Sequence, residues 1–244
     1  MITVAGGQDG VVTGGGGGQG VLAIVIGAGE PVGWELGGRS LLQRAVTALL
    51  GSGRVGRVVV LAGAAGADAL VGEPRAVLVS ADELAALLGT VVDDAPVVVH
   101  DTVHPLVSAR LVAQVVDALT ADGGAAGAVA VRSVTDTLKW VDDRDVITGT
   151  ADREGYRVIC SPQAHRAAAL RAVLAAPGAG GPAADLIGSL PALLGRPDAP
   201  GGAARLVTVA APEEVFRVVD RGDLELAAAL LAEAGRETEP QGSR

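Results

Sequence analysis

The sequence predicts an α/β protein built around a doubly wound, mostly parallel β-sheet, with a β-hairpin arm inserted into it. From residue 21 onward, short runs rich in Val and Ile alternate with longer segments of helical periodicity, which is typical of right-handed βαβ units. One run, Val97–Val99, is entirely β-branched and leads to Asp101, as expected of a buried parallel strand that ends in a loop. Between residues 132 and 157 the pattern changes to alternation around a turn, which predicts the hairpin.

The composition is typical of a globular protein whose core is packed from small aliphatic side chains. Of 244 residues, 49% are hydrophobic and 2% aromatic. No run reaches the roughly 18 apolar residues of a membrane-spanning helix, and the N-terminus lacks the pattern of a signal peptide. The single cysteine, Cys160, excludes an intramolecular disulfide and a cysteine-rich zinc site. We therefore expect a soluble cytoplasmic protein, and the net charge of −9 argues against nucleic acid as a general partner.

The first half of the chain supplies most of the predicted sheet. Residues 1–20 contain nine glycines and are expected to form a flexible leader, because ordering glycine costs backbone entropy. Ser40 is of the residue type that caps helix N-termini. We expect strands at 21–26, 55–61, 97–99 and 126–131, a tight turn at 27–29, and helices at 40–50, 81–88 and 108–119.

The second half begins with the arm, residues 132–157, in which strands at 136–141 and 146–150 flank a turn at 142–145. An isolated hairpin is marginally stable in water. Its apolar residues Val134, Leu138, Trp140 and Ile147 need cover, so we expect a homodimer formed through the arm. Beyond it we expect helices at 164–174, 183–194 and 223–234, a strand at 205–209 and a polar tail at 235–244, with residues 21–234 forming a single domain.

Asp101 is the first candidate functional residue. Ligands of open α/β sheets bind where strands end at their carboxyl edge, and a carboxylate there can bind Mg²⁺ through oxygen. Asp is also favoured as a cap of turns and helices, so the position alone leaves a catalytic and a structural role open.

Short motifs in matching order extend this interpretation along the chain. They are His100-Asp-Thr-Val-His-Pro105, Thr135-Asp-Thr-Leu-Lys139, Asp152-Arg153 with Ser161-Pro-Gln163, and Arg217-Val-Val-Asp-Arg-Gly-Asp223-Leu224. In these motifs, over about residues 21–233, the chain resembles the 2-C-methyl-D-erythritol 4-phosphate cytidylyltransferases, the CTP-using enzymes of the non-mevalonate isoprenoid route. The resemblance implies a nucleotide-diphospho-sugar transferase-like, Rossmann-type fold and transfer of CMP from CTP to a sugar-alcohol phosphate.

The resemblance also assigns roles to individual residues. Asp101 would be catalytic and would hold Mg²⁺, the implied cofactor, while Arg153 would act from the arm across a dimer. An arginine fork can bind phosphate oxygens in pairs, and a Thr hydroxyl can donate a hydrogen bond to them. The implied sugar-phosphate-binding residues are Thr137, Lys139, Ser161, Arg217 and His104, and the implied nucleotide-binding residues are Gly27, Ala28 and Gly29.

The chain departs from the family pattern on the nucleotide side. The family carries an Arg and a Lys in the loop after the first strand, where they hold the triphosphate, whereas the loop Gly27–Glu35 has no basic residue and carries Glu30 and Glu35. Arg39 does not replace them, because residues 36–42 match the family segment after that Lys, and His104 stands where the family has Arg. Two unit charges 4 Å apart at an effective dielectric near 20 interact by about 4 kcal/mol. Because Glu30 and Glu35 would repel the triphosphate that the family's Arg and Lys attract, the sequence predicts impaired turnover of CTP.

Two alternatives stay open at this point. A catalytically degenerate relative would bind a sugar phosphate or pair with an active subunit. A nicotinamide dinucleotide enzyme is suggested by glycines 27, 29 and 33 after a strand, but the second strand ends without the acidic residue that such enzymes use for the ribose.

Overall fold

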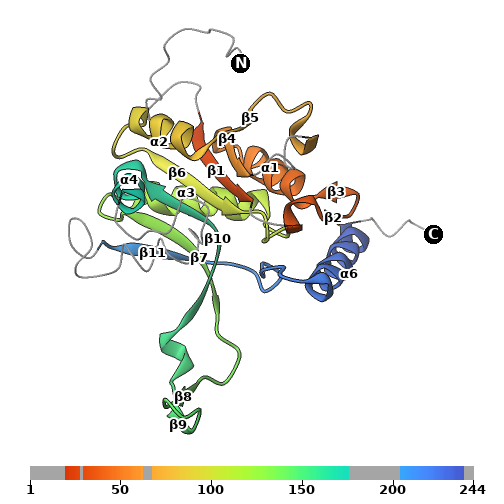
Figure 1. The fold of residues 1–244 in the computed structure, drawn as a ribbon, viewed down its shortest axis with the longest axis vertical. Coiled ribbons are helices and arrows are strands. Elements are labelled where there is room, and N and C mark those ends of the chain that lie inside the picture. Colours follow the sequence, from red (N-terminus) through yellow and green to blue (C-terminus); the bar gives the residue numbers. More distant parts are fainter. Residues whose placement is uncertain (1–19, 28–29, 63–67, 176–203, 239–244) are drawn as a thin grey trace.

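In the computed structural model, a seven-stranded sheet forms the centre of the molecule (Figure 1). The structure describes residues 20–27, 30–62, 68–175 and 204–238. The strands lie in the order β11-β7-β10-β6-β1-β4-β5, which makes β6 the central strand. Their bounds are β1 (Val21–Gly27), β4 (Val55–Ala62), β5 (Ala76–Leu78), β6 (Pro96–Asp101), β7 (Gly127–Ser133), β10 (Arg157–Arg166) and β11 (Leu206–Ala210).

The sheet is mostly parallel, as predicted. Strand β1 pairs in parallel with both β4 and β6, β4 with β5, and β7 with β11. Strand β10 is the exception, because it runs antiparallel to both β6 and β7. A hairpin-like connection returns the chain in the opposite direction, whereas a parallel pair needs a crossover, and the chain reaches β10 from β7 through the arm.

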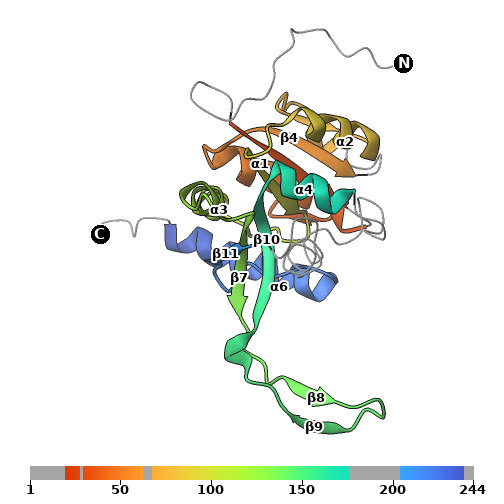
Figure 2. The ribbon, with the colours of Figure 1, turned by 90° about the vertical axis from the view of Figure 1, so that its left-hand side faces the viewer.

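Helices cover both faces of the sheet. Their bounds are α1 (Leu41–Gly51), α2 (Ala81–Thr90), α3 (Ala109–Ala121) and α4 (Ala167–Leu174). The buried residues of α3 and all those of α1 except Leu41 pack in one core cluster, and those of α2 and α4 pack in another. Figure 2 shows α3 and α4 on opposite sides of β10. In β6, Val98 belongs to the first cluster and Val97 and Val99 to the second, because successive strand residues point to opposite faces.

Local sequence explains where the helices begin. Ser40 and Ser80 each accept a hydrogen bond from the backbone N–H three residues on, and the side chains of Gln43 and Glu83 accept one from the backbone N–H of the cap. Both are capping boxes. The two-residue turn between β2 (Glu35–Leu36) and β3 (Arg39–Ser40) has positive φ at Gly37 and Gly38, as a tight hairpin turn of this type requires.

Two predicted element boundaries were wrong, and two stretches of strand were not predicted. The helix expected at 164–174 begins only at Ala167, because Ala164, His165 and Arg166 are paired in β10 with β6. The first arm strand, expected at 136–141, is β8 (Lys139–Val141), and the second is β9 (Ile147–Thr150). Strand β5 and residues 157–163 of β10 were not predicted as strands. The helix expected at 183–194 lies outside the described residues, and so does the leader expected at 1–20 except for its last residue.

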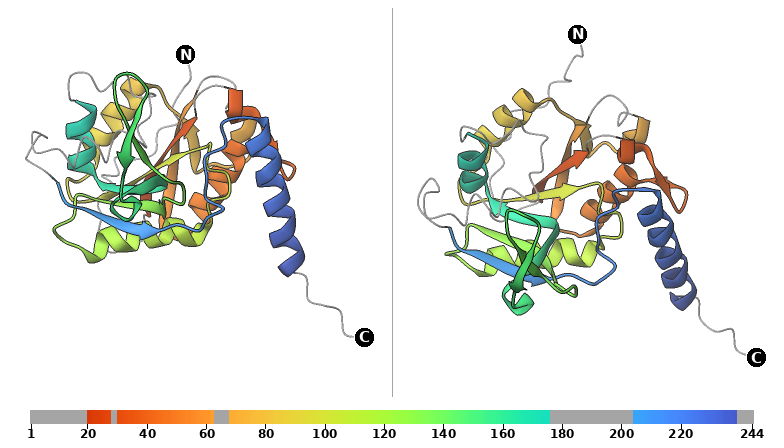
Figure 3. Two further views of the ribbon diagram at one scale, coloured as in Figure 1. Left: turned by 90° about the horizontal axis from the view of Figure 1, so that it is seen from below. Right: turned by 60° about the horizontal axis from the view of Figure 1, so that its bottom comes forward.

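The final helix, α6 (Arg221–Thr238), extends the predicted helix at both ends and lies beside β2 (Figure 3). Its buried residues Leu224 and Ala227 pack with Leu36, Leu41 and Val218 in a third core cluster. No helix among the described residues has the length and apolarity needed to cross a membrane.

Candidate active site

Asp101 is the last residue of β6, at the carboxyl end of the central strand, as the sequence predicted. Val97, Val98 and Val99 are fully buried and hold the strand between β1 and β10. Asp101 itself is half-buried and is aligned with Ile26 near the end of β1. The two parallel strands therefore end at the same edge, where the loop after β1 begins.

The loop after Asp101 is held by short-range hydrogen bonds. The Val103 N–H donates to Asp101 Oδ1 at 3.1 Å, and the His104 N–H donates to the Asp101 carbonyl at 3.1 Å. The Thr102 N–H donates to the Ile26 carbonyl at 3.0 Å. Further along, the Pro105 carbonyl accepts from Arg44 Nε at 3.2 Å, which fastens the loop to α1.

Ser161 lies directly behind Asp101 and is fully buried. Its Oγ is 3.0 Å from the Asp101 N–H, which donates to it, and 2.6 Å from His100 Nδ1. Burial lowers the pKa of His100 to about 3, so this imidazole is neutral at pH 7. Ser161 was predicted to bind substrate. Its hydroxyl instead contacts the backbone N–H of Asp101, and its side chain is not exposed at the surface.

His104 is also buried and neutral. Its pKa is lowered to about 4, first by burial and then by the positive charges of Arg217 and Arg132. Arg217 is exposed and lies on the segment that leads to α6. The next residue, Val218, donates its N–H to the Val103 carbonyl at 2.8 Å. The structure thus brings together Asp101, Ser161, His104 and Arg217 of the predicted site residues.

The other predicted sugar-phosphate residues lie on the arm, which stands away from the sheet (Figure 2). Thr137, Lys139 and Arg153 are all exposed. Lys139 Nζ donates to Thr150 Oγ1 at 2.7 Å, and Arg153 Nη1 donates to the Thr135 carbonyl at 2.6 Å. Within one chain the structure does not bring these residues to Asp101.

On the nucleotide side, Gly27 is the last residue of β1, while Ala28 and Gly29 lie outside the described residues. After a 3-10 turn at Glu30–Gly33, Trp34 packs on the third core cluster and Glu35 is exposed. The Arg221 guanidinium stacks over the Trp34 ring, 4.4 Å from its centroid. This cation–π contact joins α6 to the end of the loop. Sequence reasoning missed it, because residues 34 and 221 belong to no shared motif.

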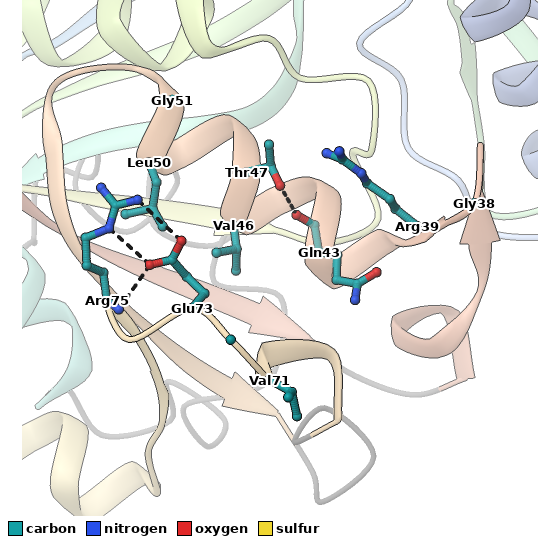
Figure 4. A pocket seen from close by; sticks show the side chains of 11 residues that line it. Gly38, Arg39, Gln43, Val46, Thr47, Leu50, Gly51, Val71, Glu73 and Arg75 are labelled. Carbon is teal, nitrogen blue, oxygen red and sulfur yellow. Dashed lines mark hydrogen bonds and ion pairs between the residues drawn. The ribbon is translucent and has the colours of Figure 1, made fainter.

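A separate hollow of about 690 Å³ lies between α1 and the loop before β5 (Figure 4). Arg39, Gln43 and Thr47 lie along it at one side, and Glu73 pairs with Arg75 at the other (Figure 4). None of the predicted site residues lines it. It therefore contributes no group to the site around Asp101.

Sequence reasoning also gave no role to His100. It was quoted only as part of the motif around Asp101. Its contact with Ser161 depends on the pairing of β6 with β10, which are separated by the whole arm. The sequence shows only that His100 precedes Asp101 at the end of a strand, and this does not reveal that Ser161 is the partner of His100.

Comparison with known proteins agrees with this architecture. The family model described as "2-C-methyl-D-erythritol 4-phosphate cytidylyltransferase" matches residues 21–233. Relatives of that name from Rhodococcus jostii (strain RHA1) and Nocardia farcinica (strain IFM 10152) are 34% and 33% identical over 212 and 205 residues. These alignments cover 82% and 80% of this chain and 85% and 83% of the relatives.

Solved structures agree with the fold. That of 2-C-methyl-D-erythritol 4-phosphate cytidylyltransferase from Thermus thermophilus matches with a TM-score of 0.64 at 26% identity, over 88% of this chain and 99% of that one. That of 4-diphosphocytidyl-2C-methyl-D-erythritol synthase from Anaerococcus prevotii matches with a TM-score of 0.68 at 18% identity, over the same shares. The fold, the motifs at the carboxyl edge of the sheet and the extent of the match lead to one conclusion: the chain belongs to the 2-C-methyl-D-erythritol 4-phosphate cytidylyltransferase family.

Proposed function

We propose that the protein transfers a cytidylyl group from CTP to 2-C-methyl-D-erythritol 4-phosphate in isoprenoid biosynthesis. A phosphate oxygen of the sugar phosphate forms a bond to the α-phosphorus of CTP, and the bond from that phosphorus to pyrophosphate breaks. The observation that carries the proposal is the placement of Asp101 at the carboxyl end of the central strand, next to the end of β1, in a chain of this family.

Asp101 is the residue that would hold Mg²⁺. The described residues contain no group of three or more His, Cys, Asp or Glu side chains arranged as a metal cluster, and Asp101 would contribute one carboxylate to the ion. That donor set suits Mg²⁺, which keeps several waters and takes its other ligands from substrate phosphates. The bound ion would neutralise charge on those phosphates.

The remaining side chains bind and orient two anionic substrates, which is the main task in transfers of this kind. Arg217 is the exposed cation on the segment next to the Asp101 loop and suits a phosphate group. His104 is neutral at pH 7, so it can offer a hydrogen bond but no charge.

The arm residues complete this site if the protein is a homodimer, which is the second part of the proposal. Each arm would lie against the other subunit, so that Thr137, Lys139 and Arg153 meet the partner's substrate. Support comes from the exposed apolar side chains of the arm, with Trp140 55% and Ile147 63% exposed. Such a surface favours a partner.

A pyrophosphate-release assay with CTP, Mg²⁺ and 2-C-methyl-D-erythritol 4-phosphate tests the function. Asp101→Asn should lower the rate by about a hundredfold or more, the scale for removing one electrostatic stabiliser. Asp68→Asn, a change of the same chemistry at an exposed site, should leave the rate unchanged. Binding of the sugar phosphate without release of pyrophosphate would instead identify the catalytically degenerate relative that the acidic loop suggests.

A further inference from the structure

His100 and Ser161 form a buried pair directly behind Asp101. They come from β6 and β10, two strands that are neighbours in the sheet but are separated in sequence by α3, β7 and the arm. His100 and Ser161 are 1% and 0% exposed. No substrate phosphate can reach either side chain without displacing the core around it.

The pair stands where the ladder between the two strands is interrupted. The register of β6 with β10 ends at Val99 and Gln163, and the adjoining residue of β10, Pro162, has no N–H to contribute. The Thr102 N–H points to β1, so the Asp101 N–H points to the β10 side. There it donates to Ser161 Oγ at 3.0 Å, in place of a backbone carbonyl.

The hydrogen-bond partners of Ser161 indicate which nitrogen of the His100 ring carries the hydrogen. Ser161 Oγ has two partners, the Asp101 N–H and His100 Nδ1. A hydroxyl that accepts from one must donate to the other if both of its capacities are to be used. His100 Nδ1 then accepts the hydroxyl hydrogen, and the ring carries its own hydrogen on Nε2. The opposite tautomer leaves the serine hydrogen without a partner, whereas Nε2 has no hydrogen-bond partner among the described residues in either tautomer and does not distinguish the two.

We propose that His100 and Ser161 act together as positioning residues for Asp101: Nδ1 of His100 orients the Ser161 hydroxyl, and Ser161 Oγ holds the Asp101 backbone N–H. The proposal deepens the cytidylyltransferase function proposed above and rests on it. It assigns Ser161 a role behind the carboxylate in place of contact with the sugar phosphate, and it gives His100 a role.

The consequence is that hydrogen bonds hold Asp101 both at its backbone and at its carboxylate. The Asp101 N–H is bonded to Ser161, its carbonyl to the His104 N–H and its Oδ1 to the Val103 N–H. The last two bonds lie within one short loop and move with it. The Ser161 bond ties Asp101 to β10, while the Thr102 N–H ties the next residue to β1, so the start of the loop is held to the strand on each side.

Amide variants of His100 test this geometry, because an Asn amide overlies the Nδ1 position and the longer Gln amide overlies Nε2. His100→Asn keeps an acceptor for Ser161 and Ser161→Thr keeps the hydroxyl, so both should retain turnover within about threefold of wild type. His100→Gln and Ser161→Ala should lower kcat by about tenfold to a hundredfold, the scale of a small misplacement of a reacting group. KM for both substrates should change little.

Thr102→Val is the matched control. Thr102 is fully buried beside Asp101, and its Oγ1 has no hydrogen-bond partner among the described residues, so this variant should keep wild-type kcat. Loss of activity in Thr102→Val to the same extent as in Ser161→Ala would show that any change of the buried loop is harmful. Equal loss in His100→Asn and His100→Gln would also overturn the proposal.

A readout that needs no turnover uses the wild-type protein. The chain has three histidines, so ¹⁵N spectra of the imidazole rings are simple, and the signals that disappear in His100→Asn identify His100. Nδ1 should have the shift of an unprotonated nitrogen and Nε2 that of a protonated one. The opposite assignment overturns the pairing even if His100→Gln and Ser161→Ala fail to fold. A wild type that releases no pyrophosphate contradicts the proposed function, and the spectrum then decides the pairing by itself.

Discussion

At the scale of single residues, the site separates buried neutral groups from exposed charged ones. His100, His104 and Ser161 are buried behind Asp101, where burial lowers the pKa of both imidazoles. Arg217 and the arm residues carry their charges at the surface. Substrate phosphates would therefore meet exposed cations, while the groups behind Asp101 stay neutral.

Arg153→Ala tests the role of the arm cation. If Arg153 meets the sugar phosphate, its loss should weaken binding of that ligand by roughly 1.5–3 kcal/mol, the range for a charged hydrogen bond. Arg144→Ala, which removes an equally exposed arginine from the same arm, should have no effect. Calorimetry with 2-C-methyl-D-erythritol 4-phosphate measures both, and equal affinities for the two variants would remove Arg153 from the site.

Acid sensitivity of folding follows from the buried histidines. His165 is fully buried, and burial lowers its pKa from 6.5 to about 4. Below pH 6.5 the unfolded chain takes up a proton that the native state does not take up until about pH 4, so stability falls as the pH falls through this window. At about 1.4 kcal/mol per pH unit, the loss from this residue at pH 5 is about 2 kcal/mol.

Urea unfolding at pH 7.5 and pH 5.0 measures this effect. His165→Gln should reduce the difference in unfolding free energy between the two pH values, whatever it does to stability at pH 7.5. His165 suits this test because it lies in β10 away from the Asp101 loop and bonds to Gln163. An unchanged pH dependence in the variant would show that His165 is not the responsible group.

At the scale of elements, β10 and the arm that precedes it shape the site. The antiparallel direction of β10 places Ser161 against β6, and the same segment sends the arm away from the sheet (Figure 1). The exposed apolar residues Trp140, Val141, Val146 and Ile147 all lie on the arm. A two-stranded ribbon of this kind gains stability when another surface covers it.

Deletion of residues 136–149 should convert a dimer into monomers, because it removes these apolar side chains. Sedimentation at micromolar concentration measures the change. Trp140→Ser with Ile147→Ser should weaken the dimer in the intact chain, whereas Val219→Ser, at an apolar residue 62% exposed outside the arm, should not. A full-length protein that already sediments as a monomer would contradict the arm interface.

At the scale of the whole molecule, the charge distribution disfavours binding of CTP, one of the two proposed substrates. The chain has a net charge of −9, and the loop Gly27–Glu35 has two acidic residues and no basic one. A triphosphate needs positive charge at its binding site. The loop therefore predicts weak binding of CTP, whereas Arg217, Arg153 and Lys139 favour the sugar phosphate.

Glu30→Arg combined with Glu35→Lys reverses the charge of this loop. The double variant should bind CTP more tightly than wild type in calorimetry, since two repulsive charges become attractive ones. Pyrophosphate release should improve less than binding, because added charge attracts the triphosphate without fixing the position of the reacting groups. Fast turnover by the wild type at micromolar CTP would show that cations elsewhere in the protein bind the triphosphate.

The sequence by itself determined the order of most strands and helices, the family, and the place of Asp101. These depend on features that are local in the chain: the β-branched run before Asp101, the capping serine at 40, and short motifs in order. Hydrophobic periodicity and capping act over a few residues, so they can be read without knowing the fold.

Only the tertiary structure decided how distant segments meet. Residues 164–166 have a composition that suits a helix, but pairing with β6 makes them a strand, because ladder hydrogen bonds and burial outweigh a weak local preference. The contact of Ser161 with His100, and that of Arg221 with Trp34, join segments whose spacing in the chain carries no signal. Such contacts depend on strand register and on the packing of α6, which are properties of the whole folded chain.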